Sequence, residues 1–147
     1  MTRDLKIRPV QPNDLKAGIT LLSDAGLPTA DVSVERLALV AELNGQLVGL
    51  IGLEQYGALG LLRSLVVDAG NQGYGIGQQL VDSLERLATT SGIRELWLLT
   101  IDADRYFERL GFFRQARSAA PGAIAASEEF SSLCPDDAVL MSKSVAS

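Results

Sequence analysis

The chain has 147 residues, of which 47% are hydrophobic and 21% charged, as in a globular protein with one core. Its net charge of -5 argues against nucleic acid or an anionic membrane surface as a partner. There is no histidine and one cysteine, Cys134. This composition excludes a Ser-His-Asp or Cys-His nucleophilic system and an internal disulfide, and we expect no metal site.

The N-terminal segment, Met1–Val10, carries several charged side chains and therefore lacks the apolar region of a signal peptide. The longest apolar run, Leu47–Leu53, is too short to span a bilayer. We find no internal repeat and no linker-like stretch. These features predict a single domain over residues 1–147 in the cytoplasm.

The first half of the chain predicts one helix and four strands. Leu5–Val10 is expected to be an edge strand, followed by an amphipathic helix that begins near Asp14 and has Leu15, Ile19 and Leu22 on its apolar face. The next expected strands are Leu37–Leu43, Gln46–Gln55 and Leu59–Asp68. An Asn-Gly pair joins the first two of these three, which is a strong hairpin signal, so the three should form an antiparallel meander.

In the second half of the chain, the spacing of apolar residues changes to that of a helix. A helical stripe of apolar residues comprises Ile76, Leu80, Leu84, Leu87 and Ala88. Glu95–Ile101 then predicts a buried strand and Ala103–Leu110 a short helix, and two last strands are expected at Phe112-Phe113 and Asp137–Ser142 with an irregular stretch between them. This order predicts a mixed α/β or α+β sheet with a parallel crossover in its second half.

A glycine-rich turn between strand and helix is the most informative segment. Gly73, Gly75 and Gly77 separate the strand end Leu65–Asp68 from the helical stripe. Backbone amides at such a helix start favour a phosphate or pyrophosphate, although each glycine taken singly could serve only a tight turn. Gln78 follows Gly77, so the turn is not a Walker A loop, and the spacing also fails the dinucleotide fingerprint.

Two segments resemble the GNAT N-acetyltransferase family. Gln72–Gly77 matches its pyrophosphate signature, Gln/Arg-x-x-Gly-x-Gly/Ala, and Tyr106–Phe112 is similar to its aromatic-aromatic-x-x-x-Gly-Phe segment. The resemblance covers nearly the whole chain. It implies a mixed twisted sheet of six to seven strands with three to four helices, in which a parallel pair, Leu61–Asp68 and Glu95–Ile101, splays apart.

The resemblance also implies acetyl-CoA as the co-substrate. Its pyrophosphate would bind the turn formed by Gln72, Gly73, Tyr74, Gly75, Ile76, Gly77 and Gln78. The pantetheine arm would pair with the main chain of Leu65, Val66 and Val67, and the Leu65 amide would polarise the thioester carbonyl. Phe107 stands where many members carry a tyrosine that protonates the leaving thiolate, so we expect Phe107 to pack beside the cofactor and another group or water to supply any proton.

On the acceptor side, direct attack by an amine needs a general base, and Glu54 is the candidate; the alternative is an exposed carboxylate at a strand end. Tyr56 would line the same cavity or lie in a solvated turn. Arg63, with Ser64, would either pair with a carboxylate or oxyanion of the substrate or form a salt bridge with a surface acid. Arg117 is a weaker candidate for the acceptor pocket.

Three segments, Glu54–Tyr56, Leu62–Leu65 and Glu129–Pro135, resemble the short arsenic-resistance N-acetyltransferases. This resemblance implies a small-molecule amine acceptor, such as an amino-acid-like arsenical, with no nucleic-acid or membrane partner. Monomer and homodimer both remain open. The alternative functions are a non-catalytic acyl-CoA-binding sensor, favoured by Phe107, and a toxin acting on aminoacyl-tRNA, which fits the acidic charge poorly.

Overall fold

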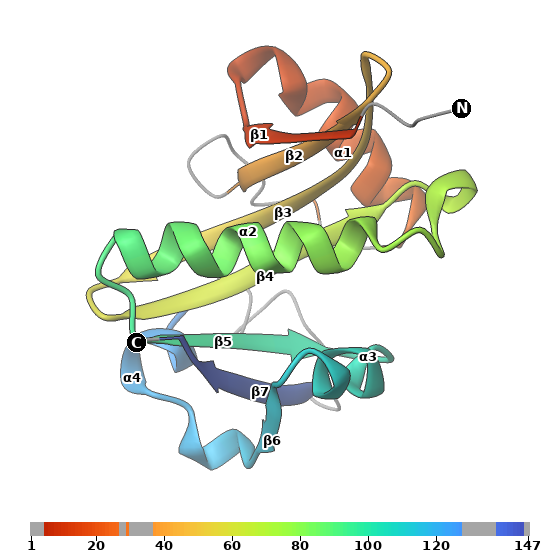
Figure 1. The fold of residues 1–147 in the computed structure, drawn as a ribbon. Helices are drawn as coiled ribbons and strands as arrows, with labels where there is room; N and C mark the ends of the chain where they lie inside the picture. The colour runs from red at the N-terminus through yellow and green to blue at the C-terminus, as the bar shows by residue number, and fades with distance from the viewer. Residues whose placement is uncertain (1–4, 27–28, 30–36, 128–137, 146–147) are drawn as a thin grey trace. The chain divides into compact units, whose positions relative to one another are not determined.

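The computed structural model shows the chain as two compact units, each discontinuous in sequence (Figure 1). The structure describes residues 5–26, 29, 37–127 and 138–145. The first unit comprises Met1–Glu54 and Arg63–Leu87, and the second comprises Gln55–Leu62 and Ala88–Ser147. The expectation of a single domain stays a prediction.

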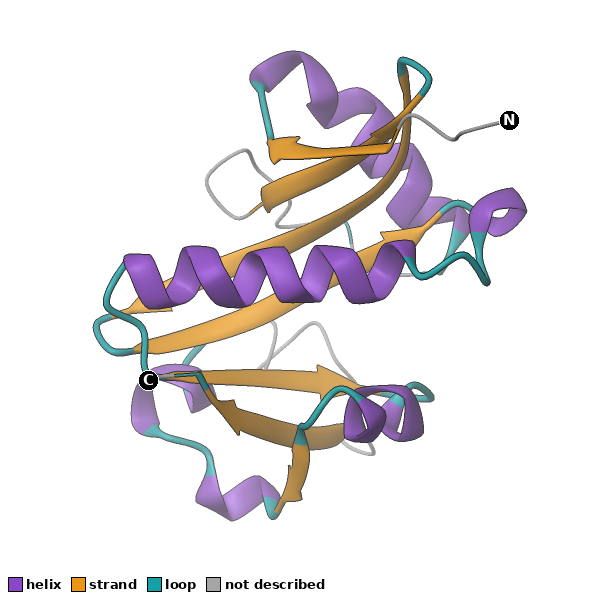
Figure 2. Cartoon of the chain, in the orientation of Figure 1, coloured by secondary structure: helices purple, strands orange, loops and turns teal. Residues whose placement is uncertain are grey.

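The helices and strands follow the predicted order (Figure 2). The strands are β1 (Leu5–Pro9), β2 (Leu37–Leu43), β3 (Gln46–Tyr56), β4 (Leu59–Val67), β5 (Glu95–Thr100), β6 (Phe113–Gln115) and β7 (Val139–Ser144). The helices are α1 (Leu15–Asp24), α2 (Ile76–Thr90), α3 (Asp104–Arg109) and α4 (Gly122–Ala125). The predicted bounds agree with these to within two residues, except that α4 was not predicted. None of the described helices has the length and apolar character needed to cross a membrane.

The strands of the described chain are hydrogen-bonded in the order β1-β2-β3-β4-β5-β7-β6. The pairs β1–β2, β2–β3, β5–β7 and β6–β7 are antiparallel. The pair β4–β5 is parallel, with Leu59–Leu61 in register with Glu95–Trp97. The sheet is therefore mixed and contains the predicted parallel crossover. That the two strands separate beyond these paired residues stays a prediction.

The β2–β3 hairpin has the turn that its Asn-Gly pair predicts. Leu43 pairs with Gln46, and the two residues between them, Asn44 and Gly45, have φ values of 52° and 83°. Two consecutive left-handed residues are typical of a type I′ turn, whose twist matches that of the flanking strands. A purely local signal thus sets the pairing at the turn end of this hairpin, whereas farther along the register shifts between Ala41 and Glu42 and between Leu37 and Leu39.

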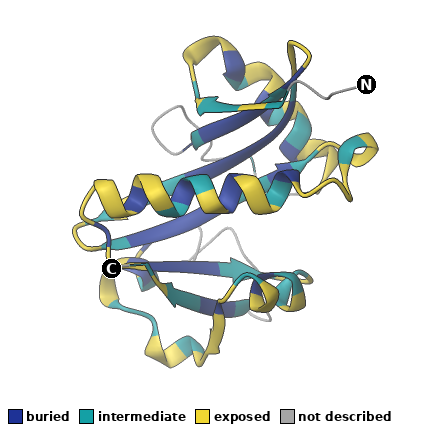
Figure 3. Cartoon of the chain, in the orientation of Figure 1, coloured by how far each residue is buried: buried dark blue, intermediate teal, exposed yellow. Residues whose placement is uncertain are grey.

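In the first unit, α1 and α2 pack on neighbouring residues of β3. A Cβ built on Gly18 of α1 would lie 3.0 Å from Leu50, and a Cβ built on Gly49 would lie 3.2 Å from Leu80 of α2. Successive strand residues point to opposite faces of a sheet, so the two helices cover opposite faces of β3. Burial agrees with this arrangement, since Leu50 and Leu80 are both fully buried. Figure 3 shows buried and exposed residues alternating along α2. Leu87, which the predicted stripe included, is 38% exposed.

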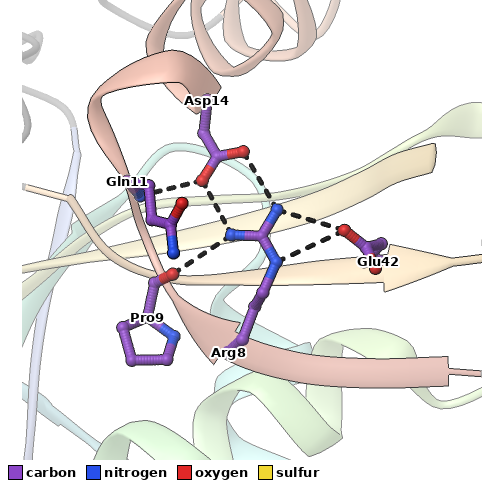
Figure 4. A network of polar contacts seen from close by, with 5 residues as sticks. All are labelled: Arg8, Pro9, Gln11, Asp14 and Glu42. Carbon is purple, nitrogen blue, oxygen red and sulfur yellow. Dashed lines mark hydrogen bonds and ion pairs between the residues drawn. The ribbon is translucent and has the colours of Figure 1, made fainter. Parts of the chain in front are cut away.

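A cluster of polar side chains ties the start of α1 to the first two strands (Figure 4). Arg8 on β1 contacts Asp14, which precedes α1, and Glu42 on β2. The cluster links segments that the sequence separates by more than thirty residues.

The second unit has its own core of Leu61, Trp97, Ile124 and Leu140. Ile124 belongs to α4, so the stretch that we predicted to be irregular supplies a fully buried core residue. In the same unit, the Lys143 ammonium donates a hydrogen bond to the Leu110 carbonyl at the end of α3, over 2.8 Å. A cation at a helix C-terminus is favourable because it meets the negative end of the helix dipole.

Candidate active site

The glycine turn, residues 70–77, joins β4 to α2 within the first unit. Gly73 and Gly75 have φ values of 87° and 76°, a region that residues with a Cβ rarely adopt. The amide of Gln79 donates to the Gly75 carbonyl over 3.1 Å, which closes the first turn of α2. Two of the three predicted glycines are therefore required by the backbone conformation itself.

The space beside the turn is open. A Cβ built on Gly73 or on Gly75 meets no protein atom within 4 Å, and Tyr74 between them is 62% exposed. A ligand can therefore approach the backbone of the turn closely. The positive end of the 15-residue helix α2 lies beside it, and such a helix start attracts anions. The local geometry thus fits a pyrophosphate group.

Hydrogen bonds from Asp68, Asn71 and Gln72 hold the turn in place. The amide of Asp68 donates to the Val48 carbonyl over 2.7 Å. The Asn71 side chain donates to the Asp68 carboxylate over 3.0 Å. The Gln72 side chain donates to the Val67 carbonyl over 3.1 Å, so this predicted cofactor-binding residue also fastens the turn to β4. The spacing of Asp68 and Asn71 is a local turn signal that could have indicated the first part of this bracing.

Ser64, a predicted substrate-binding residue, has a left-handed backbone conformation inside β4. Its φ is 60°, and only one other described non-glycine residue, Asn44, has a positive φ. The N–H of Leu65 belongs to the peptide that follows Ser64, so this conformation turns the Leu65 amide away from its direction in a regular strand. Leu65 is the residue whose amide was predicted to polarise a thioester carbonyl. Backbone strain of this kind often marks functional sites.

Glu54 and Arg63, the predicted base and the predicted substrate-binding arginine, contact each other. Arg63 Nη1 lies 2.6 Å from Glu54 Oε2, and the two side chains are 1% and 10% exposed. Arg63 Nε also donates to Ser64 Oγ over 3.2 Å. The alternative of Glu54 as an exposed strand-end carboxylate is therefore wrong. The salt bridge considered for Arg63 does form, but its partner is this largely buried acid and not a surface one.

Three further predicted site residues, Tyr56, Phe107 and Arg117, belong to the second unit. Tyr56 packs against the core of that unit. Phe107 is 6% exposed, and its ring makes edge-to-face contacts with Tyr106 and Phe112 at centroid distances of 5.4 and 5.6 Å. Arg117 donates a hydrogen bond to the Ala138 carbonyl over 3.1 Å. The segment Glu129–Pro135, with Cys134, lies outside the described residues.

Comparison with protein families identifies the chain. Residues 17–112, more than half of its length, match the model of the Acetyltransferase (GNAT) family. The chain belongs to the GNAT acetyltransferase family. Comparison with curated protein sequences gives no match. The family signature predicted for residues 72–77 lies within the matched region. Within the described parts of the chain, no three side chains of the metal-ligating types cluster together.

Solved structures show the same fold at low sequence identity. N-acetylglutamate synthase from Neisseria gonorrhoeae, complexed with coenzyme A and N-acetyl-glutamate, superposes with a TM-score of 0.84 and 18% identity over 97% of this chain. The chain spans only 35% of that protein. Rv2747 from Mycobacterium tuberculosis, solved with CoA, has a TM-score of 0.79 and 22% identity, covering 95% of this GNAT chain and 98% of its own.

A third structure is the ribosomal-protein-S18-alanine N-acetyltransferase from Escherichia coli. It has a TM-score of 0.76 and 19% identity, and the match covers 97% of this chain and 95% of that one. These three proteins carry different names and share one architecture, so the likeness supports the GNAT fold and leaves the acceptor to be inferred from the site.

Proposed function

We propose that this protein is an N-acetyltransferase that moves an acetyl group from acetyl-CoA to the amine of a small molecule in the cytoplasm. The observation that carries the proposal is the glycine turn, where Gly73 and Gly75 adopt left-handed conformations beside open space at the start of α2. Membership of the GNAT family supports acetyl-CoA as the ligand, whose pyrophosphate would bind at this turn.

The acetyl-CoA site would extend from the turn along β4. Amides of residues 73–78 would hold the pyrophosphate, and the main chain of Leu65, Val66 and Val67 would pair with the pantetheine arm. The left-handed Ser64 supports this role, because it aims the Leu65 amide out of the regular strand. Such an amide stabilises negative charge on the carbonyl oxygen during attack, which is often a large catalytic contribution.

The reaction would proceed by direct attack. The acceptor ammonium gives one proton to the Glu54 carboxylate, and the neutral amine attacks the thioester carbonyl carbon. The carbon–sulfur bond breaks, and the second amine proton accompanies formation of the CoA thiol. Phe107 has no hydroxyl to donate that proton, so water is the expected carrier. Glu54 then releases its proton to solvent, which balances the reaction.

The acceptor would be an amine that also carries an anionic group. Arg63 beside Glu54 supports this, because a guanidinium binds carboxylates and other oxyanions well. The N-acetylglutamate synthase of similar fold was solved in complex with an acetylated amino acid, N-acetyl-glutamate. The resemblance of residues 54–56 and 62–65 to arsenic-resistance N-acetyltransferases favours an amino-acid-like arsenical and a role in arsenic resistance.

Calorimetric titration with acetyl-CoA and a thiol-release assay would test the proposal. The assay would cover amino acids, polyamines, aminoglycosides and amino-acid arsenicals, with the Cys134 background subtracted. We expect acetyl-CoA to bind and one acceptor class to release CoA thiol. Binding without turnover of any amine would instead support a non-catalytic acyl-CoA sensor. Absence of acetyl-CoA binding would contradict both functions.

A further inference from the structure

The Glu54–Arg63 ion pair raises a chemical question. The proposed reaction uses Glu54 to accept a proton from the acceptor and Arg63 to hold the acceptor's anionic group. In the structure, these two side chains form an ion pair with 2.6 Å between Arg63 Nη1 and Glu54 Oε2. An acceptor that engages both of them must therefore replace contacts that already exist.

Burial makes the electrostatic balance of this pair important. The Arg63 and Glu54 side chains are only 1% and 10% exposed, and together they carry no net charge. A simple alkylammonium brought to the pair would add an uncompensated positive charge in a poorly solvated place, which is costly. An acceptor that carries an ammonium and a carboxylate adds no net charge.

The same reasoning describes an exchange of partners. The acceptor carboxylate takes the place of Glu54 on Arg63, and the acceptor ammonium becomes the new partner of Glu54. The net charge at the site stays zero, since one ion pair becomes two and the four charges involved sum to zero before and after the exchange. Arg63 Nε keeps its contact with Ser64 Oγ, which holds the guanidinium on β4 during the exchange.

We propose that this exchange selects zwitterionic acceptors, so that Glu54 acts as a base only when a carboxylate near the acceptor amine has replaced it on Arg63. The inference rests on the proposed acetyltransferase function and narrows its substrate class to amines with an adjacent anionic group. The proton then moves from the acceptor ammonium to Glu54, the neutral amine attacks the thioester, and CoA leaves as the thiol. An amine without the carboxylate leaves the Glu54–Arg63 ion pair intact, so Glu54 does not act as its base.

The test compares amino acids with the amines that lack only their carboxylate. Three matched pairs serve as probes: L-phenylalanine with 2-phenylethylamine, L-methionine with 3-(methylsulfanyl)propylamine, and L-glutamine with 4-aminobutanamide. For at least one pair we expect kcat/KM to be about a hundredfold higher for the amino acid, within the range for a buried charge that loses its partner. Equal kcat/KM within every pair that turns over would overturn this inference and leave the acetyltransferase function standing.

The variant Arg63→Met assigns the preference to the guanidinium. It should reduce the amino-acid-to-amine ratio of kcat/KM to within about threefold, because no cation remains to receive the carboxylate. Arg63→Lys keeps the charge and should retain part of the preference. The matched control is Arg8→Met, which removes another ion-paired arginine of the same unit and should leave the ratio unchanged. Since the readout is a ratio, partial loss of folded protein cancels.

The outcomes separate this inference from the proposed function. An unchanged ratio in Arg63→Met contradicts the partner exchange, even if the enzyme is active. No turnover of any of these probes or of any acceptor in the wider thiol-release assay, with acetyl-CoA bound, contradicts the proposed enzymatic function and the exchange together. A high ratio in the wild type that falls only in the Arg63 variants supports both.

Discussion

Arg8 holds Asp14 through two parallel hydrogen bonds, from Nη1 to Oδ2 over 2.8 Å and from Nη2 to Oδ1 over 3.0 Å (Figure 4). The backbone amide of Gln11 adds a third bond to Oδ2, also over 2.8 Å. The hydrogen bond from Arg8 is the main cause that lowers the pKa of Asp14 below its usual 3.8, against the opposing effect of burial. The same contact raises the pKa of Arg8.

This pairing predicts how stability depends on pH. The pKa of Asp14 is lower in the folded than in the unfolded protein. The stabilisation that the Asp14 carboxylate contributes is therefore fully present above about pH 4 and is lost as the pH falls through the pKa of the folded protein. Asp14→Asn should lower the free energy of unfolding by about 1–3 kcal/mol at pH 7. Urea unfolding at pH 7 and at steps down to pH 3 would measure both effects. Asp24→Asn is the control, because Asp24 is exposed. If the free energy of unfolding fell equally steeply with decreasing pH in Asp14→Asn and in the wild type, the prediction would be contradicted.

The left-handed Ser64 predicts a difference between two small substitutions. Ser64→Ala and Ser64→Gly both remove the hydroxyl that contacts Arg63. Alanine keeps the penalty for a φ of 60°, whereas glycine relieves it. We therefore expect Ser64→Gly to be more stable than Ser64→Ala by about 1 kcal/mol, after allowing for the greater freedom of unfolded glycine. Chemical denaturation would measure this, and a more stable alanine variant would show that β4 is not strained here.

Gly49 predicts an effect of close packing. A Cβ at this position would lie 3.1 Å from the Val66 carbonyl oxygen and 3.2 Å from Leu80 Cδ1. Gly49→Ala should therefore lower the free energy of unfolding by about 1–3 kcal/mol, the usual cost of overpacking. Gly122→Ala is the control, because a Cβ there meets no atom within 4 Å and should be neutral or slightly stabilising in α4. Thermal unfolding of both variants would distinguish them.

The glycine turn predicts a specific loss of acetyl-CoA affinity. Gly75→Ala forces a Cβ onto a residue with a φ of 76°, at a cost of about 1–2 kcal/mol. If the turn relaxes to avoid this cost, its amides move, and the Kd for acetyl-CoA should rise about tenfold. Gly70→Ala, in the same turn but outside the left-handed region, should leave the Kd unchanged in the same titration. Equal Kd values for both variants would place the pyrophosphate elsewhere.

Local patterns allowed much of the fold to be predicted. The Asn44-Gly45 pair specified the β2–β3 turn and the strand pairing beside it, and the spacing of glycines indicated the strand-to-helix turn. Both signals lie within a few residues of the structure that they specify. The helix α4 was missed because its four residues are too few to show an apolar period, although Ile124 is fully buried.

The sequence was sufficient to name the residues of the candidate site but not the contacts between them. Glu54 and Arg63 were each singled out, yet their pairing depends on where two strands bring them and on the kink at Ser64. Neither the composition nor the period of an apolar strand specifies which acid reaches a given arginine. The close approach at Gly49 is equally non-local, because the Val66 carbonyl that requires it lies on another strand.

The short strand β6 has a consequence for how the protein behaves at high concentration. It is the last strand of the sheet in the described chain, its three residues are exposed, and Phe113 on it is 71% exposed. The edge of a sheet presents unpaired backbone groups that can pair with another chain, and the exposed Phe113 adds apolar surface at this edge. Arg114, which contacts Asp104 and Glu108, places charge beside Phe113 and opposes such pairing. Its replacement by an apolar residue should therefore promote aggregation on concentration, and a charged residue in place of Phe113 should improve solubility.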